Sequence, residues 1–289
     1  MKMRVARFPI IVFALLAVLP APSGLVIASS FARYNETTYT GSQCGDCCQS
    51  DDATGEDLTD DWADRMEAQL YTRHDADEWS FDRTWLADYH LRWWGVDDEH
   101  TDRRDIVLIS GHGGREYIDG ERVWHFSHNE EYLGSCRTTP SNSMRLGDDT
   151  GDTLEILHVQ SCNPMTVDDS VHANTWRSVF GGVHQITGFH GTSYGNNHIK
   201  GHYYNLARDG FHSAVAIEWV NELYDSNGYQ IWYDNCPVAY TGRNSEAAAT
   251  ALLTNEQYDT RSQYARVEDP TVFKRIYVDG CHPDDANEM

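Results

Sequence analysis

RDIVLISGHGG (residues 104–114) and LEILHVQSCN (residues 154–163) decide how this chain folds. Each is a run of aliphatic and β-branched residues, short enough to be a buried strand, that ends in a small or polar residue with a reactive side chain. The first run leads to His112 in a glycine-flanked turn, and the second leads to Cys162. Ligands and chemistry collect beyond the carboxyl ends of parallel strands in open α/β sheets. We therefore expect His112 and Cys162 to meet at one edge of a parallel sheet.

The remaining sequence alternates between helical and strand patterns. Apolar residues every four positions predict helices, Asp119-Gly120 between two apolar pairs predicts a hairpin, and short apolar runs predict further strands. The helices are expected over residues 62–70, 81–93 behind a Ser80 cap, 168–180, 211–223 and 245–253, and the strands over residues 183–189, 229–233 and 272–278. This alternation is typical of a three-layer α/β/α sandwich with a mostly parallel sheet.

The first 28 residues have the pattern of a secretory signal peptide. Lys2, Arg4 and Arg7 precede an apolar run, and Val26-Ile27-Ala28 before Ser29 fits the small-residue cleavage rule. An uncleaved membrane anchor is the alternative, because apolar residues resume at Leu25. We expect a secreted protein with no membrane contact after cleavage. It would consist of a disulfide-tied N-terminal segment, residues 29–60, and a single domain, residues 61–289.

The charge of the chain limits its partners. The formal net charge is -23, with 22 Lys and Arg against 45 Asp and Glu. Nucleic acids and anionic membranes require basic patches that displace counterions, so neither is expected as a partner. An acidic exterior of this kind suits a salty medium or is simply a well-solvated surface. The sequence gives no indication of the oligomeric state.

Seven cysteines in an exported chain indicate an oxidising compartment. Cys162 alone ends a buried strand, so we expect it to be the one thiol left outside the disulfides. A zinc knuckle around residues 44–48 is disfavoured, because no second cysteine pair follows at ligand spacing. Six cysteines allow fifteen pairings, so connectivity stays open. The disulfide candidates lie in polar or glycine-rich contexts: Cys44, Cys47, Cys48, Cys136, Cys236 and Cys281.

The two strand ends together supply the groups that acyl transfer needs. A thiolate is a competent nucleophile, and a nearby imidazole lowers the pKa of the thiol and returns its proton to the leaving group. The backbone N–H groups of Gly113 and Cys162 could form the oxyanion hole, because a glycine beside the histidine lets the main chain approach the substrate. His112 is therefore the candidate base and acid, and Cys162 is the candidate nucleophile.

These motifs resemble the caspase-like cysteine peptidases. Caspases carry Gln-Ala-Cys about 50 residues after a histidine, and here Gln160-Ser161-Cys162 lies 50 residues after His112. The two motifs, together with Trp176 and FGGVHQITGF (residues 180–189), are also similar to the uncharacterised DUF6345 family. The caspase resemblance implies a caspase-like fold, peptide or protein substrates, a His112/Cys162 dyad and no metal or cofactor. The residues that it places at the substrate are Gly114, Gln160, His190, Ser193 and Tyr194.

The chain departs from the caspase pattern in two respects, and two other functions stay open. Asn163-Pro164 replaces the glycine-containing turn of caspases, and their substrate-binding arginines are not recognisable. A non-catalytic extracellular module could use the same loops to hold a peptide or glycan. A zinc-dependent hydrolase could use His125 with His128, or His198 with His202, but neither pair carries the Glu of His-Glu-x-x-His. His158 alternates with buried strand positions, so we expect it in the core.

Overall fold

The fold is taken from a computed structural model of the chain. The predicted leader, Tyr194 and the first three cysteines lie outside the residues that it describes. So do most of the helix predicted over residues 168–180 and the strand predicted over residues 229–233. The described residues are 30–35, 53–71, 80–83, 101–118, 121–132, 135–138, 144–148, 151–162, 164–165, 176–193, 197–225 and 235–281.

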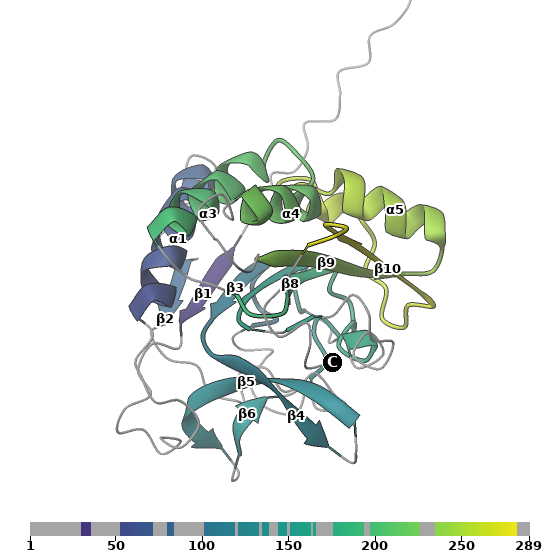
Figure 1. The fold of residues 1–289 in the computed structure, drawn as a ribbon. Coiled ribbons are helices and arrows are strands. Elements are labelled where there is room, and N and C mark those ends of the chain that lie inside the picture. The colour runs from purple at the N-terminus through teal and green to yellow at the C-terminus, as the bar shows by residue number, and fades with distance from the viewer. Residues whose placement is uncertain are drawn as a thin grey trace, which may run out of the picture.

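A seven-stranded, mostly parallel sheet runs through the centre of the molecule (Figure 1). Its order is β10-β9-β8-β7-β3-β1-β2, in which β2, β1, β3, β7 and β8 are parallel neighbours and β9 is antiparallel to both β8 and β10. The strands are β1 (Phe31–Asn35), β2 (Ser80–Arg83), β3 (Ile106–Ser110), β7 (Ile156–Gln160), β8 (Gln185–His190), β9 (Cys236–Arg243) and β10 (Val272–Tyr277).

Both faces of the central strands are buried, which explains why their sequences are continuously apolar. In β3, Ile106 and Leu108 pack into the hydrophobic cluster between the sheet and the helices. Val107 and Ile109 pack into a second hydrophobic cluster, on the other face of the sheet. Successive side chains of a strand point to opposite faces. A strand buried on both sides therefore needs apolar residues at nearly every position.

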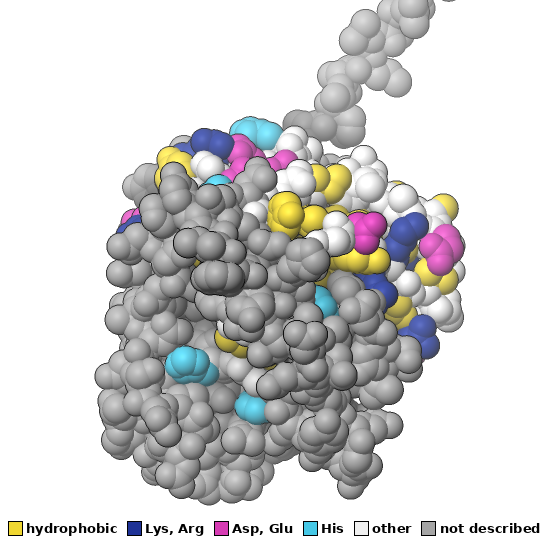
Figure 2. Space-filling model, viewed as in Figure 1, with side chains coloured by type: hydrophobic (Ala, Val, Ile, Leu, Met, Phe, Trp, Pro, Cys, Tyr) yellow, Lys and Arg dark blue, Asp and Glu magenta, His cyan; other side chains and the backbone are white. Residues whose placement is uncertain are grey.

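The helices α1 (Ala53–Tyr71), α3 (Asn197–Asp209), α4 (Val215–Asp225) and α5 (Glu246–Asn255) cover one face of the sheet (Figure 1). The predicted helix start near residue 245 is confirmed, because the Ser245 side chain accepts a hydrogen bond from the Ala248 N–H. Figure 2 shows the described acidic side chains scattered among basic and uncharged ones. None of the helices described is long and apolar enough to cross a membrane.

A three-stranded antiparallel sheet and adjoining loops lie on the opposite face (Figure 1). Its strands are β4 (Gly113–Ile118), β5 (Glu121–Tyr132) and β6 (Ser135–Thr138). Ile118 pairs with Glu121, so the hairpin predicted at Asp119-Gly120 is confirmed. The protein is therefore a mixed α/β structure with a mostly parallel sheet, as predicted. Its second outer layer contains this small sheet in the described part of the chain, where helices were expected.

The start of the helix predicted over residues 81–93 is wrong, and residues 84–93 lie outside the described residues. Residues 80–83 form β2, which pairs in parallel with β1 through Phe31 and Ser80. The four-residue recurrence of aromatic residues is misleading there, because pairing with β1 decides the local structure. Glycine disfavours helices, yet α3 runs through Gly201 between His198 and His202. Gly201 is exposed with open space around it, so it only weakens the helix.

The N-terminal segment is part of the main sheet. β1 lies between β3 and β2, and α1 runs across the boundary that was predicted at residue 61. Arg33 in β1 is buried and forms an ion pair with Asp60 of α1. The segment 29–60 therefore contributes an interior strand and the first turns of a helix to the domain. The sequence pattern did not predict β1, because the charged Arg33 interrupts its short run of residues.

One disulfide is described, between Cys236 and Cys281, with 5.8 Å between their Cα atoms. It joins the start of β9 to the segment after β10, two positions that are 45 residues apart. Both cysteines were predicted disulfide candidates. Cys44, Cys47 and Cys48 lie outside the described residues, and only the backbone of Cys136, in β6, is described.

Candidate functional site at the carboxyl ends of the strands

The carboxyl ends of β3 and β7 lie side by side. The two strands are parallel, with Ile106 opposite Ile156 and Ser110 opposite Gln160. One residue further along, the Gly111 N–H donates a hydrogen bond to the Gln160 carbonyl at 3.1 Å. The chain reverses its direction across the sheet next to this pair, between β3 and β1, because β2 lies on one side of β1 and β3 on the other. In open α/β sheets, ligands bind near such a reversal of strand order.

The turn that carries His112 packs directly on the segment that carries Cys162. A Cβ atom placed on Gly113 would overlap the Ser161 Oγ and would lie 2.6 Å from the Cys162 carbonyl oxygen. Only glycine allows this approach without a shift of the backbone. His112 thus stands between two residues, Gly111 and Gly113, that both touch the 160–162 segment. The backbone adjacency predicted from the sequence is confirmed.

Two stacked tryptophans hold the chain on either side of Asn163. The Trp124 indole on β5 donates a hydrogen bond to the Cys162 carbonyl at 3.0 Å, and the Trp176 indole donates to the Pro164 carbonyl at 2.5 Å. Their ring centroids are 5.4 Å apart, with an interplanar angle of 28°. Both rings are buried, so their two hydrogen bonds hold the turn that carries Cys162 in place. The sequence did not predict this role for Trp124, because only the folded chain brings β5 close to the segment after β7.

The loop after β8 closes over Cys162. Gly191 has a φ of 83°, a left-handed conformation that favours glycine and turns the chain at the end of β8. The Cys162 thiol donates to the Ser193 carbonyl at 3.8 Å, and the Gln160 side-chain amide donates to the Ser193 hydroxyl at 2.5 Å. His190 is buried and bridges to Met165. Three predicted site residues, Gln160, Cys162 and Ser193, are therefore in direct contact.

Among the described residues that follow the strands, several predicted site residues are partly exposed. The strands β3 and β7 are buried along their whole length. Beyond them the partly exposed residues are His112, Gly113, Gly114, Cys162, Thr192 and Ser193. Cys162 is present as a thiol and not as half of a disulfide. Gly114 lies against the His125 ring, whose Cε1 would be 3.0 Å from an added Cβ. The site thus combines a thiol, a histidine and glycine main chain at a partly exposed edge.

His158 is a core residue, as predicted. Its ring nitrogens contact the Thr187 hydroxyl at 2.7 Å and the Tyr258 hydroxyl at 2.8 Å, and its ring stacks on Trp219 with 4.9 Å between centroids. Burial lowers the pKa of His158 to about 3. The imidazole is therefore neutral at ordinary pH and takes no part in the site.

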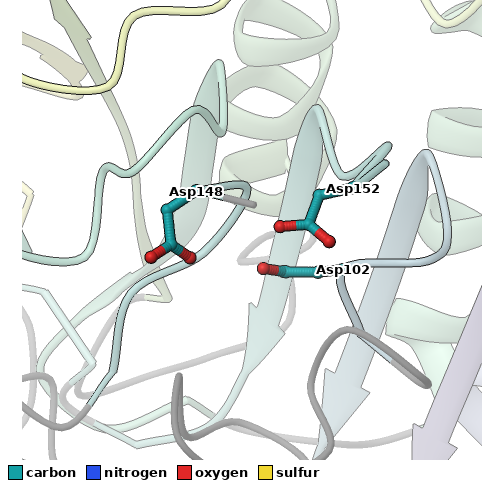
Figure 3. Close-up of side chains that lie close together, drawn as sticks. All are labelled: Asp102, Asp148 and Asp152. Carbon is teal, nitrogen blue, oxygen red and sulfur yellow. The ribbon is translucent and has the colours of Figure 1, made fainter. Parts of the chain in front are cut away.

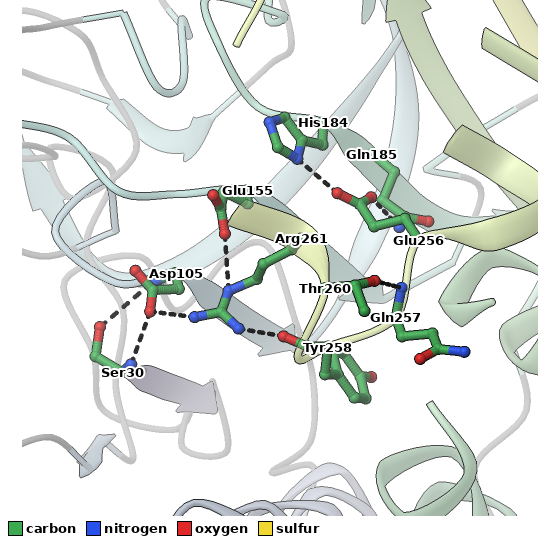
Figure 4. A network of polar contacts seen from close by, with 10 residues as sticks. All are labelled: Ser30, Asp105, Glu155, His184, Gln185, Glu256, Gln257, Tyr258, Thr260 and Arg261. Carbon is green, nitrogen blue, oxygen red and sulfur yellow. Dashed lines mark hydrogen bonds and ion pairs between the residues drawn. The ribbon is translucent and has the colours of Figure 1, made fainter. Parts of the chain in front are cut away.

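The amino ends of the same strands hold a buried network of charged side chains (Figure 4). The Arg261 guanidinium lies 2.6 Å from Asp105, which precedes β3, and 2.7 Å from Glu155, which precedes β7. Asp105 also accepts the Ser30 N–H at 2.9 Å. Burial raises the pKa of Glu155 to about 8, although the nearby Arg261 charge lowers it. One guanidinium thus links three segments that are distant in sequence.

A second part of this network joins β8 to the end of α5 (Figure 4). Glu256 is fully buried and accepts the His184 Nδ1 at 2.6 Å and the Gln185 side-chain amide at 2.5 Å. The Val215 N–H donates to the Glu256 carbonyl at 2.8 Å. Glu256 therefore joins the end of α5 to β8 through its carboxylate and to the start of α4 through its backbone carbonyl.

An acidic trio lies near the amino ends of β3 and β7. Asp102, Asp148 and Asp152 bring carboxylate oxygens within 4.8 Å of one another (Figure 3). Such oxygens suit a hard cation. However, the Gly147 N–H donates to Asp102 at 2.6 Å, and Arg266 donates to the Gly147 carbonyl at 2.7 Å. These hydrogen bonds give the trio a structural role, and we assign no metal to it.

The two histidine pairs that were considered as zinc ligands lie on α3 and on β5. His198 and His202 share the helix α3, and the His202 Nδ1 lies 3.0 Å from a Glu222 oxygen. His125 is buried on β5, and the same strand carries the backbone of His128. Neither pair belongs to a cluster of three or more ligands among the residues that are described.

A family model described as "Domain of unknown function (DUF6345)" matches residues 41–259. The match covers more than half of the sequence, so the chain belongs to this family. No curated protein matches the chain. The family description carries no activity, and the function must be argued from the site.

Proposed function

Because the DUF6345 family brings no assigned activity, we propose a function from the strand-end site: an exported cysteine hydrolase that cleaves peptide bonds with a His112/Cys162 dyad. The single observation that carries this proposal is the packing of Gly113 against the Cys162 carbonyl, 2.6 Å from the position of an added Cβ. This contact supports the proposal because it brings a histidine turn and a cysteine turn together at the carboxyl edge of a parallel sheet, and nucleophilic catalysis needs the two side chains close together.

In the proposed reaction His112 takes the proton of the Cys162 thiol. The thiolate attacks the carbonyl carbon of the peptide bond, and the C–N bond breaks as His112 gives that proton to the leaving amine. Water then attacks the thioester, His112 accepts a proton from this water, and the carboxylic acid leaves as the thiol is restored. The atoms balance as one peptide bond and one water giving an amine and an acid.

The oxyanion of both steps needs backbone donors. We assign this role to the N–H groups of Gly113 and Cys162, since the two residues are in contact. The hydrogen bond from Trp124 to the Cys162 carbonyl supports the assignment because it fixes the backbone of the nucleophile. Preorganised donors cost no rearrangement during the reaction.

The substrate side of the proposal uses the partly exposed loops around the thiol. Gly114 would let an extended peptide approach the main chain, and His190, Ser193 and Tyr194 would border the pocket for the residue before the cut bond. Gln160 would act from behind Ser193, to which its amide donates at 2.5 Å. No metal or other cofactor enters this mechanism.

The proposed location is outside the cytoplasm. The N-terminal leader pattern supports export. The Cys236–Cys281 disulfide also supports an oxidising compartment, where such bonds persist. Peptides or proteins in that compartment are the proposed partners.

The decisive experiment is iodoacetamide labelling of the native protein, followed by peptide mapping. We expect rapid alkylation at Cys162, none at this position in Cys162→Ser, and slower alkylation in His112→Ala. His202→Ala is the matched control, since that histidine lies on α3 beside Glu222. Cleavage of a peptide library should fall roughly 100-fold or more in His112→Ala.

Other outcomes would identify the competing functions. A Cys162 thiol that labels no faster than an ordinary cysteine, in a protein that binds peptide or glycan without cleaving it, would indicate a binding module. Cleavage abolished by a chelator but not by iodoacetamide would indicate a zinc hydrolase. Either result would end the cysteine hydrolase proposal.

A further inference from the structure

The side chain of Gln160 is held at both ends. Its Nε2 donates to the Ser193 hydroxyl at 2.5 Å, and its Oε1 accepts a hydrogen bond from the Tyr203 hydroxyl. Gln160 is only 6% exposed. A buried amide with both polar atoms bonded has one preferred orientation, because any rotation would leave a buried polar group without its partner.

Tyr203 is a rigid starting point for this chain of contacts. It lies on α3, is fully buried, and meets Trp219 edge to face at 6.1 Å. Burial raises the pKa of Tyr203 well above its ordinary value, so the phenol keeps its proton and stays a donor. Tyr203 therefore donates to the Gln160 side chain, and the Gln160 amide in turn donates to Ser193.

Ser193 is where this chain of contacts meets the thiol. Its hydroxyl accepts from Gln160, and its carbonyl accepts from the Cys162 Sγ at 3.8 Å. A carbonyl oxygen can accept a hydrogen bond from S–H, but it repels a thiolate. The contact therefore favours the neutral thiol in the resting site.

We propose that Tyr203 and Gln160 are positioning residues for Cys162: through Ser193 they hold the thiol in its resting, protonated orientation and so set how readily it ionises. This inference deepens the proposed hydrolase function and rests on it for its importance, but the ionisation of Cys162 can be measured without any substrate. Ionisation requires the sulfur to leave the Ser193 carbonyl. A firmly held Ser193 thus makes the thiolate harder to form.

Other titratable groups also influence the equilibrium between the Cys162 thiol and its thiolate. The described titratable groups on the elements around Cys162 include His112 after β3, His125 on β5 and His190 at the end of β8, besides Tyr203 on α3. Protonated imidazoles would favour the thiolate, which opposes the effect of Ser193. Changing Tyr203 leaves all three histidines in place, so it separates the two influences.

The test is the pH profile of Cys162 alkylation by iodoacetamide, read by peptide mapping in the full chain. Loss of the Tyr203 hydroxyl in Tyr203→Phe frees Gln160 and loosens Ser193. We expect the midpoint of the profile to fall by about 0.5 to 1 pH unit, the value of one typical hydrogen bond. Tyr204→Phe is the matched control on the same helix, since Tyr204 is 39% exposed, and its midpoint should equal that of the wild type.

Ser193→Ala is the second variant, in case Tyr203→Phe unfolds. It removes the hydroxyl that Gln160 contacts but keeps the carbonyl, and its midpoint should fall in the same direction. Midpoints within 0.2 units of the wild type in the folded variants, on the order of measurement error, would overturn the inference. A shifted midpoint in a protein that cleaves no peptide would support the positioning role and count against the hydrolase instead.

Discussion

The two ends of the same parallel strands are built from different chemistry. At the carboxyl ends, partly exposed residues gather around the Cys162 thiol, and glycine allows close backbone contact. At the amino ends, buried charges are concentrated, with Arg261 between Asp105 and Glu155. The strands that connect the two ends are fully buried. One end therefore has the accessibility that reactions need, and the other has the buried pairing that holds distant segments together.

From this difference we expect the amino ends of the strands to determine stability and the carboxyl ends to determine the chemistry of the thiol. Changes at the amino ends should lower stability and leave the chemistry of the thiol intact in the folded protein. Changes at the carboxyl ends should alter the thiol at a smaller cost in stability. Iodoacetamide labelling and urea unfolding measure these two properties separately.

The largest effect is expected from Arg261→Ala. Removing this guanidinium leaves the buried Asp105 carboxylate without its ion-pair partner and also removes the contact to Glu155, and breaking a buried ion pair in this way costs about 3 to 5 kcal/mol. Urea unfolding should show the loss. Arg103→Ala, at an exposed position, is the control and should change little. Normal stability in Arg261→Ala would contradict the structural role of the amino ends.

Removal of the Cys236–Cys281 disulfide should have the next largest effect. The double variant Cys236→Ser/Cys281→Ser opens a loop of 45 residues and should lose about 2 to 4 kcal/mol of unfolding free energy. Cys236 faces His190 in the sheet register, so this bond stabilises the carboxyl end of β8. Denaturation with and without reductant provides the check: the wild type should respond to reductant, and the double variant should not.

Gly113→Ala tests the contact between the two turns. The added methyl group would overlap the Ser161 hydroxyl and the Cys162 carbonyl, and overpacking of this kind costs about 1 to 3 kcal/mol. Labelling of Cys162 should slow in this variant even where the protein is fully folded. Gly201→Ala is the control, because open space surrounds Gly201 and the change should stabilise α3 slightly. Unchanged labelling in Gly113→Ala would mean that the two turns do not form one site.

Glu155 should make stability fall as the pH rises. Its folded pKa is raised to about 8 from 4.5, so the folded state keeps a proton that the unfolded state has lost, and this stabilisation disappears as pH rises through 8. Between pH 6 and 8 the loss should be about 2 kcal/mol. Glu155→Gln should flatten this part of the curve. An equally steep fall in the variant would show that other groups cause it.

His158 should have the opposite dependence and the smallest effect. Its folded pKa is lowered to about 3 from 6.5, so the unfolded chain takes up a proton that the folded core refuses. Stability should decline by about 1 kcal/mol as pH falls from 7 to 5.5. His158→Phe keeps a ring against Trp219 and should remove this decline, whatever its stability at pH 7. Urea midpoints at the two pH values give the answer.

The sequence predicted the elements whose structure is decided locally. The apolar runs of β3 and β7, the Asp119-Gly120 hairpin and the Ser245 helix start each carry their own signal, and together they were enough to bring His112 and Cys162 to one edge. The prediction of His158 as a core residue succeeded because both faces of β7 are buried, so every side chain of the strand lies in the core.

Elements that depend on distant partners were missed or misassigned. β1 contains Arg33, whose charge is tolerated only because Asp60 pairs with it. β9 contains Gly242, which makes room for Pro270 nearly thirty residues later. The indole contacts of Trp124 and Trp176 likewise require β5 to lie beneath the cysteine turn. None of these partners can be recognised from a local pattern.

The interior position of β1 constrains the order of assembly during synthesis. Phe31 pairs with Ile106 of β3 and with Ser80 of β2, so β1 lacks both of these neighbours until later parts of the chain follow. Distant pairings of this kind slow folding because a long loop must close before any contact forms. A nascent chain would therefore carry an exposed strand edge until β2 and β3 have been made, the stage at which a chaperone would be most useful.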